Sequence, residues 1–429
     1  TACDRVVVRA SAGGSGAMTT GEASGGSSRP NGTAVARGLL EEVFTEEFFE
    51  KHWERRPLHF RASERGKTAN RLPEALSVDD VAELVRRAGP SLKMFRRGEP
   101  VEAETFVEGY LEGATLVVNQ ADRCNETLFT LCRALAERLF MHVFSVVYLT
   151  PPGTQAVRMH TDDQDVFLLQ VWGKKQWIIR DAPTKLPYTE EMLGKDAPVA
   201  EELVGEPIME FTIEPHDVLY IPRGFLHEAT TGDEPSLHVT VTVPTSDFCW
   251  GVQLVKHLMQ QPHAESAQTP PLLKGFLGGG KEVDENELDS QLKGFVDNWL
   301  KGLTSSGVLD AFESRLERTN ETQARQFGRQ TEPRPGPPRV KEDSRVRLMS
   351  EVTCQCDEAA ERAVFSCASD GMRLEIPISR RCIPLLQSLT HKPKRVSELP
   401  CEDAFERICL LQTLNYQGVV QLFVRGPAG

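Results

Sequence analysis

Residues 143–180 read VFSVVYLTPPGTQAVRMHTDDQDVFLLQVWGKKQWIIR, in which β-branched and aromatic runs are separated by turns rich in Pro, Gly and Asp. The same texture continues to residue 243. Six short strands are expected, at 143–150, 165–171, 175–180, 208–213, 218–221 and 237–243. Many short strands bounded by turn residues are typical of a sandwich or barrel. Gly173 and Lys174, between two of these runs, predict a tight hairpin.

Helical periodicity flanks this β-rich region on both sides. Before it we expect a helix over about 39–53, a helix capped by Ser77, a buried strand at 114–119 and a helix over 126–140. After it, residues 250–318 carry an apolar stripe: Leu254, Leu258, Leu292, Phe295, Val296 and Leu300. A helix with one apolar face must bury it, so this segment packs either on the barrel or on a second chain.

Five segments follow from these patterns. They are a disordered leader at 1–37, a barrel-bearing domain at 38–249 with its core at about 113–245, a helical segment at 250–318, a Pro-rich linker at 319–345 and a small α+β unit at 346–429. The leader is rich in Gly and Ser and cannot bury a core. We interpret Met18 as the true start of the protein and the residues before it as translated leader. The alternative is that this segment is an organelle transit peptide. The α+β unit should hold helices at 381–389 and 402–412 and a strand at 418–424.

The charge balance favours basic protein partners. The chain has 62 acidic and 49 basic residues, for a formal net charge of −13. Residues 346–429 contain ten basic and ten acidic residues, whereas a nucleic-acid module should carry a basic excess. Direct nucleic-acid binding is therefore not predicted, although the cluster Lys392, Lys394 and Arg395 leaves a minor phosphate contact open. No stretch approaches 18 consecutive apolar residues, so no transmembrane helix is predicted.

The ten cysteines are scattered through a long chain without a signal-peptide pattern. This distribution favours reduced thiols in an intracellular compartment over a disulfide framework. Cys354 and Cys356, with Cys367, suggest a partial zinc site at first sight. Their spacing is wrong for the common zinc fingers and no His lies nearby, so zinc is not predicted there.

A candidate metal site is formed by two motifs. His160 and Asp162 lie two residues apart, which on an extended chain places both side chains on one face. His227 follows the strand at 218–221 in the motif PRGFLH. Two His and one carboxylate make the facial triad of non-haem Fe(II) oxygenases, which leaves open positions on the metal.

Lys175 is the candidate anion-binding residue. It shares one strand face with Trp177 and Ile179, and an inward ammonium near a metal is costly unless it meets an anion. The distal carboxylate of 2-oxoglutarate would supply that anion, and the Tyr148 hydroxyl could donate to it as well.

Each motif alone has a structural explanation without function. The His160–Asp162 motif could lie in a surface turn, His227 could be a hydrogen-bonded core residue, and Lys174 and Lys175 could be ordinary charges at the edge of a hairpin. Together, in this order within one β-rich region, they are far more specific.

Several motifs resemble the JmjC-type ribosomal oxygenase family: GATLVVNQADR at 113–123, YLTPP at 148–152, HTDD at 160–163, VFLLQVWGKKQW at 166–177, DVLYIPRGFLHEA at 217–229 and SLHVT at 236–240. The resemblance covers roughly residues 38–429, with specific motifs in 113–243. It implies an α+β chain built on a double-stranded β-helix, the cupin or JmjC jelly roll. It also implies helical N-terminal and dimerisation segments and a C-terminal winged helix.

The resemblance further implies Fe(II)- and 2-oxoglutarate-dependent hydroxylation of a ribosomal protein by O2, with release of succinate and CO2. The target is a His in eukaryotic members and an Arg in bacterial ones, and some members are described as histone lysyl demethylases. By position, the iron ligands are His160, Asp162 and His227. The 2-oxoglutarate contacts are Lys175, Tyr148, Thr242 and His238. A homodimer is expected, in the nucleus or nucleolus of a eukaryote, with an organelle or the cytoplasm left open.

Three positions depart from the family pattern. Val146 stands where Asn is common, Met159 where Pro is usual and His216 where Gly is frequent. Val146 removes a polar group near the expected co-substrate, while all three ligand positions are intact. The alternative from a different functional class is a non-catalytic cupin that serves as an adaptor in ribosome assembly or chromatin.

Overall fold

A computed structural model describes residues 29–423 apart from 66–68, 104, 140, 156, 260–284, 302, 333–337 and 368–370. Most of the predicted leader, residues 1–28, lies outside this range. Its end does not, because α1 (Gly32–Glu42) begins at Gly32 with the Asn31 side chain accepting from the backbone N–H of Ala34. The fold therefore begins before the predicted residue 38. Within the described part of the chain, no helix combines the length and apolar character needed to cross a bilayer.

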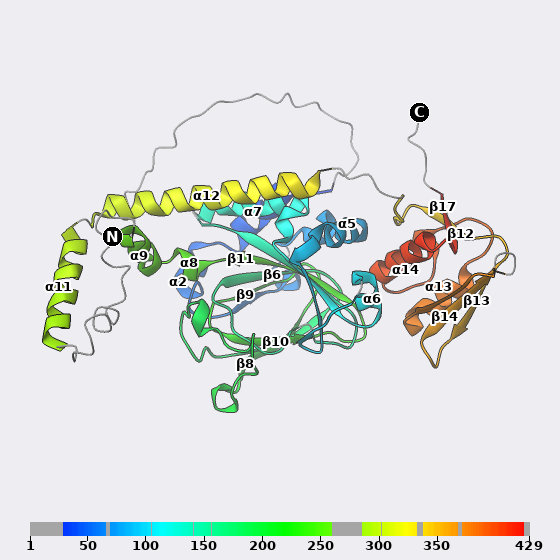
Figure 1. Ribbon diagram of the computed structural model, residues 1–429, viewed down its shortest axis with the longest axis horizontal. Coiled ribbons are helices and arrows are strands. Elements are labelled where there is room, and N and C mark those ends of the chain that lie inside the picture. The colour runs from blue at the N-terminus through cyan, green and yellow to red at the C-terminus, as the bar shows by residue number, and fades with distance from the viewer. Residues whose placement is uncertain are drawn as a thin grey trace, which may run out of the picture.

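Two facing antiparallel sheets form the barrel (Figure 1). The larger sheet has the order β1 (Leu58–Phe60), β9 (Val218–Ile221), β6 (Asp165–Trp172), β11 (Ser236–Val243), β5 (Phe144–Thr150), β4 (Thr115–Asn119), β2 (Leu92–Arg96) and β3 (Glu99–Pro100). The smaller has the order β10 (Leu226–Thr230), β7 (Lys175–Arg180) and β8 (Pro207–Ile213). Apolar side chains of β6, β7 and β9, among them Leu168, Ile179 and Leu219, fill the space between the sheets. This is the predicted double-stranded β-helix.

The turn between β6 and β7 corrects the hairpin prediction. β6 pairs with β9 and β11, whereas β7 pairs with β8 and β10, so the chain crosses from one sheet to the other at Gly173. Gly173 has φ +63°, and a Cβ there would lie 1.8 Å from the Pro235 carbonyl oxygen. Glycine is thus required at this crossing. Sheet crossing, rather than a hairpin, turns Lys175 into the barrel.

Helices cover the larger sheet. They are α1, α2 (Glu46–Lys51), α3 (Ala62–Arg65), α4 (Leu72–Ala75), α5 (Val78–Ala88), α6 (Phe106–Leu111) and α7 (Glu126–Leu139). The single helix predicted over 39–53 is wrong, because the Thr45 side chain accepts from the Phe48 backbone N–H and starts α2 separately. The Ser77 cap is confirmed, with a reciprocal capping box to Asp80.

Between the barrel and the C-terminal unit, the described residues form the helices α8 (Thr245–Phe248), α9 (Trp250–Met259), α11 (Glu285–Lys301) and α12 (Ser305–Thr331). α12 runs along α7 (Figure 1), where the rings of Phe129 and Phe327 stack with centroids 4.2 Å apart. The buried amide of Gln323 donates to Asp122 Oδ2 at 2.8 Å and to the Val143 carbonyl at 2.9 Å. The linker predicted at 319–345 is therefore wrong for residues 319–331, which belong to α12. Its polar sequence forms a helix because a few residues find partners on the barrel domain.

The C-terminal unit has two three-stranded sheets and two helices in its described residues. β12 (Arg345–Leu348) lies between β16 (Lys394–Arg395) and β17 (Val420–Phe423), and β14 (Arg362–Cys367) lies between β13 (Val352–Asp357) and β15 (Arg373–Pro377). The helices are α13 (Ile383–Ser388) and α14 (Ala404–Tyr416), close to their predicted positions. The winged helix itself stays a prediction.

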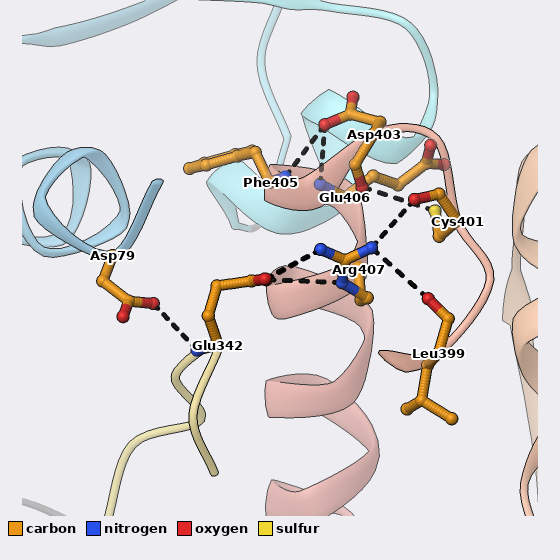
Figure 2. A network of polar contacts seen from close by, with 8 residues as sticks. All are labelled: Asp79, Glu342, Leu399, Cys401, Asp403, Phe405, Glu406 and Arg407. Carbon is orange, nitrogen blue, oxygen red and sulfur yellow. Dashed lines mark hydrogen bonds and ion pairs between the residues drawn. The ribbon is translucent and has the colours of Figure 1, made fainter. Parts of the chain in front are cut away.

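Buried polar contacts attach this unit to the barrel domain (Figure 2). The Tyr110 hydroxyl of α6 donates to Asp403 Oδ2 at 2.6 Å. Arg407 of α14 donates to both carboxylate oxygens of Glu342 at 2.9 Å and to the carbonyl oxygens of Leu399 and Cys401. The guanidinium thus holds the loop before α14 against the segment that enters the unit.

We expect Arg407→Ala to lower the free energy of unfolding by about 3 kcal/mol. The change leaves the Glu342 carboxylate and two carbonyl groups without their cationic donor. Urea unfolding of the full chain measures the effect. The matched control is Arg362→Ala, because the Arg362–Glu375 pair of the same unit is about half exposed and should change stability by less than about 0.5 kcal/mol. Equal losses in the two variants would contradict the role of Arg407.

Candidate active site

His160 and His227 lie directly opposite each other. The His160 backbone N–H donates to the His227 carbonyl at 3.2 Å, and the His227 N–H donates to the His160 carbonyl at 3.0 Å. Their ring centroids are 4.4 Å apart. The sequence placed His227 after a strand end, but it is the second residue of β10. A reciprocal backbone pair therefore sets the spacing of the two imidazoles.

Asp162 completes the predicted triad. Its Oδ1 lies 3.8 Å from His160 Nε2, and its Oδ2 lies 3.7 Å from His227 Nε2. One ligand atom from each of the three residues falls within 4.8 Å of the others. The structure thus brings together the three residues that were predicted as iron ligands.

The second ring nitrogen of each His has a backbone partner. His160 Nδ1 lies 2.8 Å from the Arg158 carbonyl oxygen, and His227 Nδ1 lies 3.0 Å from the Phe225 carbonyl oxygen. A carbonyl only accepts, so each Nδ1 carries the proton and each Nε2 presents its lone pair toward Asp162. This arrangement orients both imidazoles as metal ligands.

The protonation states suit a cation. Burial, with the neighbouring His227, lowers the pKa of His160 to about 4, so that imidazole is neutral at pH 7. Burial alone would raise the pKa of Asp162, but Lys195, His160 and His227 together hold it well below its usual range. Neutral imidazole and ionised carboxylate are the forms that bind a divalent metal.

A cavity opens beside the triad, and the three triad residues lie in its wall. Lys175 lies in its wall with 1% exposure and donates from Nζ to Thr150 Oγ1 at 3.0 Å. Burial lowers the pKa of Lys175 to about 7, and no carboxylate of the described residues offsets that cost. Trp177 Nε1 and His238 Nδ1 are also buried here and have no hydrogen-bond partner among the described residues. This cavity is lined by an ammonium group without a carboxylate partner and by two polar atoms without hydrogen bonds, among the described residues. Such a lining fits an anionic, polar co-substrate such as 2-oxoglutarate.

Tyr148 and His238, two of the predicted 2-oxoglutarate contacts, both lie in the wall of the cavity. Their rings stack with centroids 4.8 Å apart and planes 11° apart. Burial raises the pKa of Tyr148 to about 12, so its hydroxyl keeps the proton that a hydrogen bond to an anion needs.

Thr242, the remaining predicted contact, does not line this cavity. Thr240, two residues earlier on the same face of β11, lines it instead. Val146 lies directly across from Thr240 in the strand register, which places the unusual apolar residue beside the cavity.

Lys195 is the site residue that the sequence analysis missed. Its Nζ lies 2.6 Å from Asp162 Oδ1. Lys195 belongs to the long connection between β7 and β8, which also donates from the Leu193 N–H to Thr161 Oγ1 at 2.9 Å. Gly194 has φ +84°, and a Cβ there would come within 2.2 Å of the Met159 carbonyl oxygen. The connection therefore packs tightly on the segment that carries the ligands, and no sequence motif marked it.

We expect Lys195→Met to tighten binding of Co²⁺, used as a stable probe of the iron site, by about fivefold. A metal cation and the ammonium compete for the same Asp162 oxygen, and a half-exposed ion pair of this kind contributes about 1 kcal/mol after solvent screening. Calorimetric titration measures the change. Lys174→Met, which removes an exposed ion pair with Glu214, is the control and should have no effect. Weaker binding by Lys195→Met would show that Lys195 positions Asp162 instead.

The part of the chain that forms this site also matches a known protein domain. A family model described as the JmjC domain matches residues 118–248, which contain the triad and Lys175. The chain carries a JmjC domain over these residues. The match confirms the cupin-type fold with mixed helix and sheet, and the enzyme class: a 2-oxoglutarate-dependent dioxygenase that uses Fe(II). The triad offers the ligand set for Fe(II), and the cavity that contains Lys175 suits 2-oxoglutarate.

Proteins similar to this chain include two that are named ribosomal oxygenases. "Ribosomal oxygenase 1" of Gallus gallus is 26% identical over 92% of this chain and 72% of its own length. The Dictyostelium discoideum "Bifunctional lysine-specific demethylase and histidyl-hydroxylase NO66" is 36% identical over 33% of this chain and 27% of its own length. The solved Escherichia coli ribosomal oxygenase YcfD, with cobalt and 2-oxoglutarate, covers 88% of this chain and 98% of its own, at 17% identity and a TM-score of 0.40.

Proposed function

We propose that this chain hydroxylates a side chain of a ribosomal protein, a His with Arg as the alternative, and releases succinate and CO2 from 2-oxoglutarate. One observation carries the proposal: the triad His160, Asp162 and His227 shares a cavity with the uncompensated Lys175 ammonium. The names of the Gallus gallus and Dictyostelium discoideum relatives support the choice of substrate.

The residues of the chain have separate tasks in this reaction. His160, Asp162 and His227 would hold Fe(II), which supplies the oxidative chemistry when bound. Lys175 would bind the distal carboxylate of 2-oxoglutarate, and the Tyr148 hydroxyl would donate a hydrogen bond to the same group. The apolar side chains of Val166, Leu168 and Trp177 in the cavity wall exclude water from the buried part.

Lysyl demethylation of a histone is the second candidate. The name of the Dictyostelium discoideum relative contains both activities. Both begin with oxidation of a carbon–hydrogen bond, so the triad and Lys175 do not distinguish them. A non-catalytic adaptor is the less suitable function, because it would need neither an oriented triad nor a buried, unneutralised lysine.

Mass spectrometry distinguishes these functions. The purified chain is incubated with Fe(II), 2-oxoglutarate and either ribosomal proteins or methylated histone peptides, and succinate is measured in parallel. We expect succinate together with one added oxygen on a ribosomal His or Arg. Loss of a methyl group from histone lysine would favour the demethylase. No product and no succinate with either substrate class would favour the adaptor.

We also propose a homodimer formed through the helical segment after the barrel. Leu258 of the predicted stripe is buried within the chain, but Leu292, Val296 and Leu300 of α11 are 41–56% exposed. Figure 1 shows α11 at the end of α12, apart from the barrel. Three large apolar side chains at i, i+4 and i+8 make a face that a second copy could cover.

Sedimentation of the full chain at micromolar concentration tests the dimer. We expect twice the single-chain mass of 47.7 kDa, and loss of the dimer in the triple change of Leu292, Val296 and Leu300 to Ser. A parent chain that sediments at the single-chain mass would contradict the proposal.

We further propose that the protein is located in the nucleolus, where the enzyme would meet newly made ribosomal proteins. Imaging of a tagged full chain tests this location.

A further inference from the structure

A second cluster of metal-ligating side chains lies in the C-terminal unit, away from the triad. It consists of Cys382, at the start of α13, Cys401, in the loop before α14, and Glu406, in the first turn of α14. One ligand atom from each residue falls within 4.8 Å of the others. The proposed hydroxylation does not use these residues.

The two sulfurs have the spacing of a metal site. Cys382 Sγ and Cys401 Sγ are 3.8 Å apart. Two thiolates that bind one zinc ion tetrahedrally, with Zn–S bonds of about 2.3 Å, place their sulfurs about 3.8 Å apart. A disulfide needs about 2.05 Å. A thiol–thiol contact has a similar spacing, so the carboxylate beside the sulfurs is the feature that points to a cation.

Glu406 is that carboxylate. Its side chain is 2% exposed, and its Oε2 has no hydrogen-bond partner among the residues described. The nearest cation is the Arg381 guanidinium, whose Nε lies 3.7 Å away, beyond hydrogen-bond distance. Ser379 Oγ is also buried and, within the described chain, unpaired. An unsatisfied carboxylate at this depth is costly, and a bound cation would remove the cost. Figure 2 shows the Glu406 side chain extending toward Cys401.

We propose that Cys382, Cys401 and Glu406 bind Zn²⁺, with a solvent molecule in the fourth position on the half-buried Cys401 side. Binding forms two Zn–S bonds and one Zn–O bond and releases the two thiol protons to solvent. Two thiolates, one carboxylate and Zn²⁺ carry one net negative charge, which the Arg381 guanidinium balances.

The structure around the cluster tolerates loss of those protons. In the thiol form Cys401 donates to the Asp403 carbonyl at 3.3 Å. That carbonyl also accepts from the Arg407 backbone N–H at 3.0 Å, so it keeps a donor when Cys401 ionises. Arg407 holds the loop that carries Cys401 and Asp403 (Figure 2). The Tyr110 hydroxyl donates to Asp403 of the same loop. The ion would tie this loop to α13, which makes the site structural.

Cobalt titration of the full chain tests the site. The background variant carries His160→Ala and Asp162→Ala, so that the JmjC site no longer binds metal. We expect one equivalent of Co²⁺ to produce a thiolate-to-cobalt charge-transfer absorption, and Zn²⁺ to displace it. Cys382→Ser should abolish the absorption, and Glu406→Gln should weaken Co²⁺ binding at least about tenfold.

The chain supplies a matched control for the thiol pair. Cys354 and Cys356 have sulfurs 3.9 Å apart in the same unit, but among the described residues no carboxylate completes a metal-ligating group with them. Changing both to Ser should leave the absorption intact. If Cys382→Ser does not fold, protection of Cys401 from alkylation by Zn²⁺ in the background variant replaces it. Absence of the absorption, its persistence in Cys382→Ser, or no protection of Cys401 would overturn the proposal.

Discussion

Asp162→Ala is expected to abolish turnover of 2-oxoglutarate while the chain remains folded. Asp162 faces the Nε2 atoms of both His160 and His227, and its removal leaves two neutral imidazoles without the carboxylate of the facial triad. None of the three residues belongs to the hydrophobic core between the sheets, so the barrel should keep its stability. His160→Ala should have the same effect.

Succinate release and thermal unfolding measure the two halves of this prediction. We expect succinate below detection in both variants and melting temperatures within about 3 °C of the parent in the absence of metal. His391→Ala, which changes an exposed His of the C-terminal unit, is the control and should retain full activity. Parent-like turnover in Asp162→Ala would refute the assignment of the iron site.

Lys175→Met is expected to raise the 2-oxoglutarate concentration needed for half-saturation by about a hundredfold. The ammonium is buried in the cavity wall, and removing one member of a buried ion pair costs about 3 kcal/mol or more. Metal binding should change little, because Lys175 does not contact the triad. Titration with 2-oxoglutarate, followed by succinate release, gives the value. The Lys174→Met control should match the parent.

The pH dependence of co-substrate affinity gives an independent check on Lys175. In the free protein the pKa of Lys175 is about 7, so the ammonium is lost as the pH rises through 7. The affinity of the parent for 2-oxoglutarate should therefore fall from pH 7 to pH 8.5, by up to about tenfold per pH unit. Lys175→Met should lack this component. Identical pH profiles in the two proteins would show that Lys175 does not bind the anion.

Local patterns were sufficient to predict most strands, the capped helix at Ser77 and the three members of the triad. A strand alternates its faces every two residues, so β5, β7 and β11 and the inward face of Lys175 could be predicted from neighbouring residues alone. The motif around His160 and Asp162 is equally local. The motif PRGFLH, which follows a predicted strand, supplied His227 67 positions downstream.

Contacts between distant segments decided the rest. β10 is short, and its pairing with β7 and with His160 depends on a sheet that local sequence does not describe. α12 reads as a polar linker, yet Gln323 and Phe327 find buried partners on the barrel domain. Lys195 reaches Asp162 from a connection without a motif, and Cys382 meets Cys401 only because α13 and the loop before α14 fold together. Residue type and period set which face of a strand or helix is buried, but the free energy of packing distant surfaces decides which of those faces meet.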